Sequence, residues 1–244
     1  MPCAFGYVDL HCHWVPWVDD GAANVADSLA LLRVLRDAGF RKVIGTPHMR
    51  TGMFDTDRRA IVAAYDSMKP HLVTAELDIE VGLSCEHFLD DVVYQRIMAG
   101  EGVPYPGGHA VLVEFGKEFL PAMLADRLFD IRRKGLRPVI AHPERCHAFW
   151  DGLDVVEGLV DRGVVLLMDA AAVVGRYGRS TQKAAVQMLE AGLYYAVCSD
   201  AHRVSDVAGV AAGVDRIRKL VGDQEAEFLL REGPERVLHG RVEY

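Results

Sequence analysis

The chain has 244 residues, half of them apolar, with a formal net charge of −8 at pH 7 and no cluster of lysine or arginine. That length can bury a substantial core and suits one α/β domain over residues 1–244, while the acidic balance argues against a nucleic-acid partner. The first ten residues lack a basic segment followed by an apolar stretch, and the most apolar run, 164–174, is interrupted by Asp169, so we expect neither secretion nor membrane insertion.

Short apolar runs alternate with segments of helical periodicity along the chain. The predicted strands are residues 7–10, 42–45, 79–83, 110–113, 138–141, 164–168 and 195–198. The predicted helices are residues 25–38, 58–68, 89–99, 122–134, 153–162, 181–191 and 207–221. Four of these helices are followed by a glycine where a left-handed C-cap is common, namely Gly39, Gly135, Gly163 and Gly192.

Seven strand-then-helix units predict an α/β fold, specifically a distorted seven-stranded parallel (β/α)7 barrel of the TIM-barrel type. An open doubly wound sheet would give the same local pattern. The polar motifs favour the barrel, because each falls at the carboxyl end of a predicted strand, where such barrels build their active sites.

Two pairs of polar residues near the ends of the chain have the same i, i+2 spacing. His11 and His13 follow the first strand and share one face of it, so both imidazoles can reach one ion. Cys12 lies between them and points to the opposite side, which indicates a core position. Asp200 and His202 repeat the spacing after the last strand. Two such pairs predict a metal site.

Reading the strand ends in order adds further nitrogen and oxygen donors. The candidate metal ligands are His11, His13, Asp20, His48, Glu86, Glu114, His142, Asp200 and His202. Nine donors exceed what one ion needs and predict two or three divalent ions with a bridging carboxylate. Imidazole mixed with carboxylate suits manganese, iron or zinc. Asp19 competes with Asp20 for the ligand role, and either could cap the next helix.

The cysteines indicate reduced thiols and a cytoplasmic location, because their number is odd and no C-x-x-C spacing occurs. They are Cys3, Cys12, Cys85, Cys146 and Cys198. None is followed six positions later by arginine, which excludes the C-x5-R loop of a cysteine-based tyrosine phosphatase.

Six segments carry a more specific pattern: D-L-H-C-H at 9–13 with D-D-G at 19–21, T-P-H at 46–48 with G-M-F at 52–54, V-E-F at 113–115, H-P-E-R at 142–145, G-R-Y-G at 175–178 and S-D-A-H at 199–202. From residue 7 to about residue 238 the chain resembles the PHP (polymerase and histidinol phosphatase) superfamily. Within it, the chain looks like the bacterial metal-dependent tyrosine-protein phosphatases of capsule and exopolysaccharide systems. The resemblance implies a trinuclear site, usually assayed with manganese, held by the nine candidate ligands.

The resemblance also implies a function, namely hydrolysis of phosphotyrosine in a protein, with a bacterial tyrosine kinase of exopolysaccharide or capsule regulation as the substrate. The alternative is a histidinol-phosphate phosphatase or another small-molecule phosphoesterase of the same superfamily, which would use the same ligands. The G-M-F and G-R-Y-G segments favour the protein phosphatase. Assembly into oligomers is compatible with the sequence.

The predicted ions explain the chemistry, because a water shared by two cations loses its proton near neutral pH and attacks phosphorus in line. Asp20 takes part by holding an ion. Arg145 is placed to offer a planar fork to the phosphate, and Arg203 is a second candidate. A phenolate, with a tyrosine pKa near ~10, departs with little acid help, which Asp19, Glu144 or a metal-bound water could give. Four aromatic residues flank the motifs and could form walls for an aromatic ring: Trp14, Trp17, Phe54 and Phe115.

Overall fold

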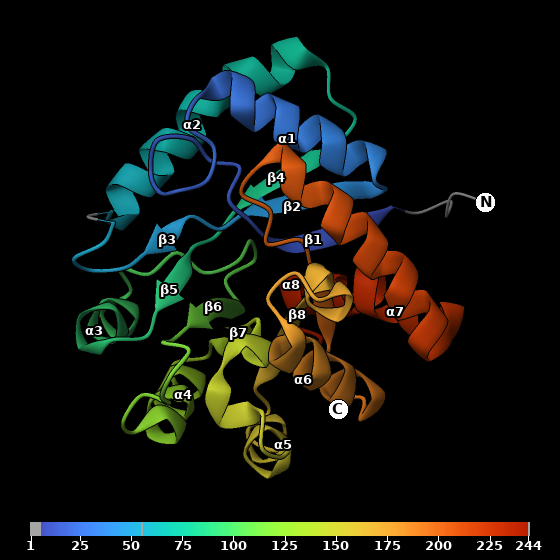
Figure 1. Ribbon diagram of the computed structural model, residues 1–244. Helices are drawn as coiled ribbons and strands as arrows, with labels where there is room; N and C mark the ends of the chain where they lie inside the picture. The colour runs from blue at the N-terminus through green and yellow to red at the C-terminus, as the bar shows by residue number, and fades with distance from the viewer. Residues whose placement is uncertain (1–5, 55, 244) are drawn as a thin grey trace.

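The computed structural model describes residues 6–54 and 56–243. Within these ranges the strands are β1 (Tyr7–Cys12), β2 (Phe40–Gly45), β3 (His48–Met49), β4 (Glu80–Leu83), β5 (Glu86–Phe88), β6 (Ala110–Glu114), β7 (Arg137–Ala141), β8 (Val165–Asp169) and β9 (Ala196–Cys198). The α-helices are α1 (Val25–Asp37), α2 (Arg58–Ala75), α3 (Asp91–Ala99), α4 (Leu124–Arg133), α5 (Asp154–Val160), α6 (Arg179–Glu190), α7 (Val207–Glu227) and α8 (Gly233–Leu238). Helices surround the strands, so the fold is α/β (Figure 1).

The strands form two parallel sheets, one of three strands in the order β1-β2-β4 and one of six in the order β3-β5-β6-β7-β8-β9. The described residues therefore do not form the single seven-stranded sheet that the sequence predicts. The difference arises because β2 gives way to β3 at Thr46 and Pro47, and β4 gives way to β5 at Ser84 and Cys85. Pro47 has no backbone N–H to donate to a neighbouring strand, which accounts for the first interruption.

The chain and its backbone hydrogen bonds nevertheless connect the two sheets. On one side the chain itself passes from one sheet to the other, from β2 into β3 and from β4 into β5. On the other side the N–H of Asp200 donates to the carbonyl of His11 at 2.9 Å, and the N–H of His13 donates to the carbonyl of Ala201 at 3.0 Å. The second connection brings the first and last motifs of the chain into contact.

Side chains alternate between two apolar clusters along β6, β7 and β8. Leu112, Val139 and Leu167 belong to a cluster that contains residues of both sheets but none of α1 to α7, so this cluster faces the inside. The residues between them pack against the surrounding helices. Glu114 and Asp169 follow Leu112 and Leu167 by two positions, and strand alternation therefore turns both carboxylates inward at the carboxyl ends of the strands.

All seven predicted helices are confirmed, and the largest error concerns the end of α2. The sequence predicts an end at residue 68, before Pro70, but α2 continues to Ala75. Pro70 is exposed, so the carbonyl that it leaves without a helical partner can be hydrated. The four predicted C-cap glycines are also confirmed, since each has a positive φ: Gly39, Gly135, Gly163 and Gly192. The short helix α8 was not predicted.

Helix α7 packs closely on the 3₁₀ segment Ala170–Val174 that follows β8. A Cβ on Gly213 would clash with the carbonyl oxygen of Ala170, whereas a Cβ on Gly209, one turn earlier, would make an ordinary 3.5 Å contact with Ala171. We expect Gly213→Ala to lower the free energy of unfolding by at least ~2 kcal/mol, because the backbone must shift, and Gly209→Ala to leave it unchanged or raise it by up to ~1 kcal/mol. Denaturant unfolding measures both, and equal stability of the two variants would contradict this packing.

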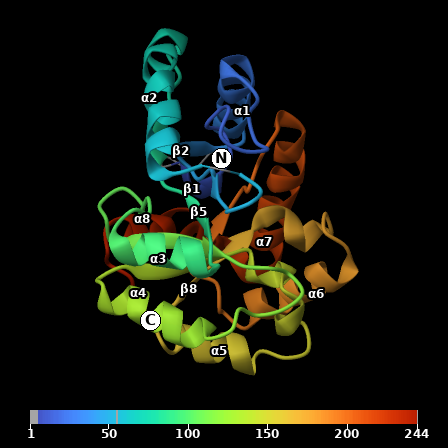
Figure 2. The same cartoon turned by 90° about the vertical axis from the view of Figure 1, so that its left-hand side faces the viewer.

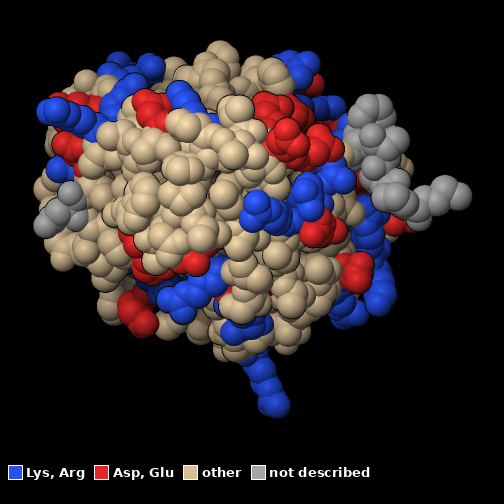
Figure 3. Space-filling model, turned by 90° about the horizontal axis from the view of Figure 1, so that it is seen from above, with Lys and Arg blue, Asp and Glu red and all other residues tan. Residues whose placement is uncertain are grey.

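Helices α1 and α2 lie side by side and project beyond the strands (Figures 1 and 2). Seen from above, over these helices, basic and acidic side chains are interspersed around a largely uncharged central area (Figure 3). Among the described residues, no helix has both the length and the apolar character needed to cross a membrane.

Candidate metal centre

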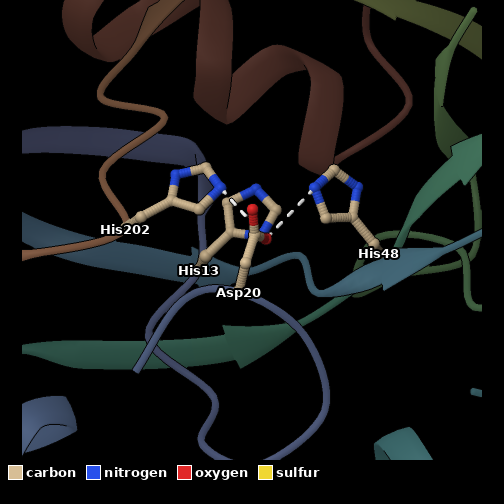
Figure 4. Close-up of side chains that lie close together, drawn as sticks. All are labelled: His13, Asp20, His48 and His202. Atoms are coloured by element: carbon tan, nitrogen blue, oxygen red, sulfur yellow. Dashed lines mark ion pairs between the residues drawn. The ribbon is translucent and has the colours of Figure 1, made fainter. Parts of the chain in front are cut away.

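The structure brings all nine candidate ligands together at the carboxyl ends of the strands. Their donor atoms form four overlapping groups, in each of which the atoms lie within 4.8 Å of one another. The groups are His13, Asp20, His48 and His202; His11, His142 and Asp200; His11, His13 and Glu86; and His48, Glu86 and Glu114. Figure 4 shows the first group, in which the imidazoles of three histidines surround the carboxylate of Asp20.

Glu86 lies at the centre of the cluster. Its Oε1 is 2.9 Å from His142 Nε2 and 3.3 Å from His11 Nε2, and its Oε2 is 2.9 Å from His48 Nδ1 and 3.5 Å from His13 Nε2. The side chain is almost completely buried. One carboxylate oriented toward four imidazoles has the arrangement expected of a bridging ligand.

His48 connects two of the groups through its two ring nitrogens. Its Nδ1 is 3.3 Å from Glu114, as well as close to Glu86, whereas its Nε2 is 3.6 Å from Asp20 Oδ1. A neutral imidazole has one unprotonated nitrogen, so His48 can give one ligand to either group but not to both. The same oxygen of Asp20 is 3.6 Å from His202 Nε2, and the Asp20 side chain is 56% exposed.

Two side chains outside the nine orient the histidines. Asp19 Oδ2 is 2.7 Å from His13 Nδ1 and also accepts a hydrogen bond from the backbone N–H of His48 at 3.0 Å. Thr46 Oγ1 is 2.6 Å from His11 Nδ1. In both histidines the Nε2 atom is thereby left to face the cluster, as is usual for metal-binding histidines. The choice between the two aspartates is thus clear in geometry, because Asp20 joins a donor group and Asp19 positions His13.

Unlike charges dominate the electrostatics of the cluster. Burial lowers the pKa of His11, but the negative charges of Glu86 and Asp200 outweigh it and raise this pKa to about 9. Burial acts in the same way on His48, where Glu86 and Glu114 raise the pKa to about 10. Burial raises the pKa of Glu86 and Asp200, yet neighbouring cations hold both pKa values well below the usual range. Protons on His11 and His48 therefore balance carboxylate charge in the metal-free protein.

The residues fit divalent cations. Several donor atoms of the cluster are buried and have no hydrogen-bond partner: His11 Nε2, His13 Nε2, His48 Nδ1, Glu114 Oε1 and Asp200 Oδ1. Buried polar atoms are normally hydrogen-bonded, so a concentration of buried atoms that have only ion-pair contacts fits a bound cation. Two atoms that share an ion at about 2.1 Å stand roughly 3.0–3.4 Å apart, and Asp200 Oδ1 is 3.1 Å from His11 Nε2 and 3.3 Å from His13 Nε2.

We predict that metal binding releases protons. The metal-free protein holds protons on His11 and His48 up to a pH of about 9 to 10, and a cation must displace them to bind. Metal affinity should therefore increase as the pH rises through the neutral range. Calorimetric titration of the metal-free protein with Mn²⁺ in two buffers of different ionisation enthalpy measures the number of protons released, and a heat that does not depend on the buffer would contradict the prediction.

The two candidate arginines differ in their surroundings. Arg145 is mostly buried, and its Nη2 forms ion pairs with Asp169 and, at 2.6 Å, with Asp200 Oδ2. Arg203 is exposed and lines a hollow of about 600 Å³ beside Asp20 and His202. Arg145 therefore lies within the cluster, and Arg203 lies at its rim.

The remaining candidate site residues divide into core and rim. Trp14 is fully buried, so it cannot line an opening, whereas Trp17 is 58% exposed. Phe54 stacks on His48, with parallel rings whose centroids are 5.1 Å apart. Phe115 is buried against Phe149. Cys12 is buried in the core, as predicted.

Several residues that contact the site were not predicted from the sequence. They are Asp9, Thr46, Asp169 and Tyr177. Asp9, Thr46 and Tyr177 lie within the recognised motifs, which was the only signal available for them. Asp169 follows a strand in the same manner as Glu114, so strand-end position would have identified it.

The fold and the site define an α/β protein with a cluster of histidine and carboxylate side chains that could hold metal ions. A family model described as capsular polysaccharide synthesis, CpsB/CapC, matches residues 7–239. The chain belongs to this family.

Individual relatives support the assignment. The chain is 29% identical over 197 residues to tyrosine-protein phosphatase YwqE of Bacillus subtilis. This match covers 81% of this chain and 78% of the relative. The chain is also 26% identical over 237 residues to tyrosine-protein phosphatase CpsB of Streptococcus pneumoniae, and this match covers 95% of this chain and 98% of the relative.

Solved structures give the same result. A chain from the crystal structures of YwqE and CpsB, described as unique metal-dependent tyrosine phosphatases, superposes with a TM-score of 0.88 and 27% identity over 97% of this chain and 96% of that chain. The phosphotriesterase homology protein of Escherichia coli, with a TM-score of 0.58 and 15% identity over 98% of this chain and 99% of that chain, shares the fold alone.

Proposed function

We propose that this protein is a metal-dependent phosphatase that hydrolyses phosphotyrosine in proteins. The observation that carries the proposal is the convergence of nine donors from separate strand ends in a chain whose relatives are named tyrosine-protein phosphatases. The metal ligands are His11, His13, Asp20, His48, Glu86, Glu114, His142, Asp200 and His202. Two or three ions, manganese in the first instance and iron or zinc otherwise, suit this set of imidazoles and carboxylates.

When bound, the ions neutralise charge on the phosphoryl group and lower the pKa of water. The chain's own residues orient the reaction. Arg145 binds the phosphate through its guanidinium, with Arg203 as a second cation at the rim. Asp19 and Thr46 hold His13 and His11 in the orientation that directs Nε2 into the cluster.

Neither of the two candidate side chains, Asp19 and Glu144, suits the role of general acid. Burial raises the pKa of Asp19, but the charge of His13 outweighs it and lowers the pKa, so Asp19 has no proton to give. Burial and the charge of Asp169 raise the pKa of Glu144 to about 8, but Glu144 is fully buried and accepts a hydrogen bond from the backbone N–H of Asp169. A phenolate leaves without strong acid help, and this favours phosphotyrosine over alkyl phosphates.

The proposal includes the architecture of the barrel, the number of domains and the cellular location. The two connected sheets act as one distorted seven-stranded barrel, in which β2 with β3 and β4 with β5 count as one strand each. Residues 1–244 form a single domain. The described cysteines, Cys12, Cys85, Cys146 and Cys198, are free and buried, which fits the reducing cytoplasm. Cys3 lies outside the described residues.

The substrate is a phosphotyrosine protein, which we propose to be a bacterial tyrosine kinase that regulates capsule or exopolysaccharide synthesis. The support is the family of the chain, which is described by capsular polysaccharide synthesis. Assembly into an oligomer is compatible with this role.

Phosphate release from a phosphotyrosine peptide tests the proposal. The manganese-loaded protein is assayed with that peptide, with a phosphoserine peptide of the same sequence and with histidinol phosphate. We expect turnover of the phosphotyrosine peptide to be fastest, because the phenolate is the best leaving group of the three. Preference for histidinol phosphate would contradict the protein-phosphatase proposal while leaving the metal centre intact.

A further inference from the structure

Arg145 has an unusual set of partners for a phosphate-binding arginine. Its Nη2 is shared between the carboxylates of Asp169 and Asp200, while its Nε is buried and has no hydrogen-bond partner. A buried cationic donor without a partner is costly, so an acceptor is expected to reach it when the site is filled. The guanidinium is thus held by two carboxylates at Nη2, while its Nε is available to donate a hydrogen bond to a ligand.

Asp169 is itself held rigidly. It is fully buried at the end of β8, and its Oδ1 accepts a hydrogen bond from the N–H of Ala171 at 2.7 Å. Its backbone N–H donates to Glu144 Oε1 at 2.9 Å, and Glu144 Oε2 is 3.0 Å from the hydroxyl of Tyr194. The carboxylate that pairs with Arg145 therefore has no freedom to turn away.

Tyr177 covers the face of the same guanidinium. The Cζ atom of Arg145 lies 3.8 Å from the centre of the Tyr177 ring, which is a close cation–π contact. The ring is placed by a tight turn, since Gly175 and Gly178 on either side have φ values of 83° and 94°, which favour glycine. The turn is also tied to the loop after β9, because Arg176 donates to Asp206 Oδ1 at 2.6 Å.

We propose that Asp169 and Tyr177 are positioning residues that fix the edge and the face of the Arg145 guanidinium, so that its remaining donors are ready to bind phosphate. The inference rests on the proposed function of the site, in which Arg145 contacts the phosphoryl group. An exposed arginine loses considerable side-chain freedom when it binds a ligand. Fixing the guanidinium before binding removes that cost, and neither residue needs to touch the substrate.

Binding of inorganic phosphate to the manganese-loaded protein, measured by calorimetry, tests this inference without turnover. The variants are Tyr177→Leu, which removes the ring; Tyr177→Phe, which keeps the ring and removes only the hydroxyl; and Asp169→Asn. The matched control is Tyr94→Leu on α3, because the Tyr94 ring also faces an arginine, Arg127, at 5.1 Å, while its hydroxyl donates at 3.0 Å to Asp130, which belongs to none of the four donor groups. Metal content and melting temperature are measured for every variant.

We expect Tyr177→Leu and Asp169→Asn to weaken phosphate binding about tenfold, and Tyr177→Phe and Tyr94→Leu to change it less than about threefold, with metal content unchanged. Tyr177 is only partly buried, so Tyr177→Leu keeps the inference testable even if Asp169→Asn fails to fold. Wild-type affinity in Tyr177→Leu, or equal weakening in Tyr177→Phe, would overturn the role of the ring.

A double variant separates positioning from a direct contact. If Tyr177 acts through Arg145, then Tyr177→Leu has no further effect on phosphate binding in an Arg145→Ala background. A loss as large as that in the wild-type background would overturn the inference, as would a wild-type protein that binds no phosphate. Failure of the proposed function is distinguishable, because a protein that binds phosphate in this pattern but releases none from a phosphotyrosine peptide would refute only the reaction.

Discussion

Replacement of His13 or Asp200 by alanine is expected to lower kcat/KM for a phosphotyrosine peptide by at least about a thousandfold, which corresponds to ~4 kcal/mol. His13 belongs to two of the four donor groups. Asp200 Oδ1 is within 3.3 Å of both His11 and His13. Either substitution therefore removes a donor that no neighbour can replace.

The fold of these variants should persist, because both side chains lie at the ends of strands and not in the apolar layers below them. Bound metal and far-UV circular dichroism are measured beside activity. His147→Ala is the matched control, since His147 lies in the segment after β7 but is absent from the donor groups and pairs with Glu118. Retention of wild-type activity by both His13→Ala and Asp200→Ala would refute the metal-centre assignment.

The second large effect concerns Arg145. We expect Arg145→Ala to raise KM for the phosphotyrosine peptide by at least about tenfold, because a charge-assisted contact to phosphate is lost. The same substitution leaves Asp169 buried without its cation, so the free energy of unfolding should fall by about 3 kcal/mol. Metal content should be unchanged. Loss of metal from this variant would show that Arg145 supports the ligands instead of the substrate.

A double variant separates the two consequences. Arg145→Ala combined with Asp169→Asn removes the unpaired charge, so stability should recover toward that of the wild type while KM remains high. Arg145→Lys retains the charge but not the planar fork. Relative to Arg145→Ala, it should recover part of the free energy of unfolding but little of the affinity for phosphate. A normal KM in the double variant would mean that Arg145 does not bind phosphate.

The strands and the donor set could be predicted because both depend on local patterns. Apolar runs of strand length identified β1, β2, β4 and β6 to β9. Each candidate ligand except Asp20 was found by its place at or just after a strand end, and Asp20 was found in the loop after the first strand. Parallel strands bring such ends together whatever the order of the strands. That is why the sequence alone could assign residues as distant along the chain as His11 and Asp200 to one cluster.

Other features depend on contacts that no local pattern contains. Asp19 and Asp20 are adjacent and identical in type, and only the position of His13 Nδ1 distinguishes the residue that orients a histidine from the one that joins a donor group. The strands β3 and β5 are short, and they pair with each other beyond the interruptions at Pro47 and Cys85. The pairing of Arg145 with Asp169 likewise joins separate strand ends.

The most direct test of the metal-centre phosphatase is phosphate release from a phosphotyrosine peptide as a function of bound metal. The protein is stripped with a chelator, reloaded stepwise with Mn²⁺, and assayed at each stage while the bound metal is counted by elemental analysis. We predict no turnover in the stripped protein and full turnover only when two or three ions are bound per chain. Turnover by the stripped protein equal to that of the loaded protein would contradict a metal-dependent reaction at this site.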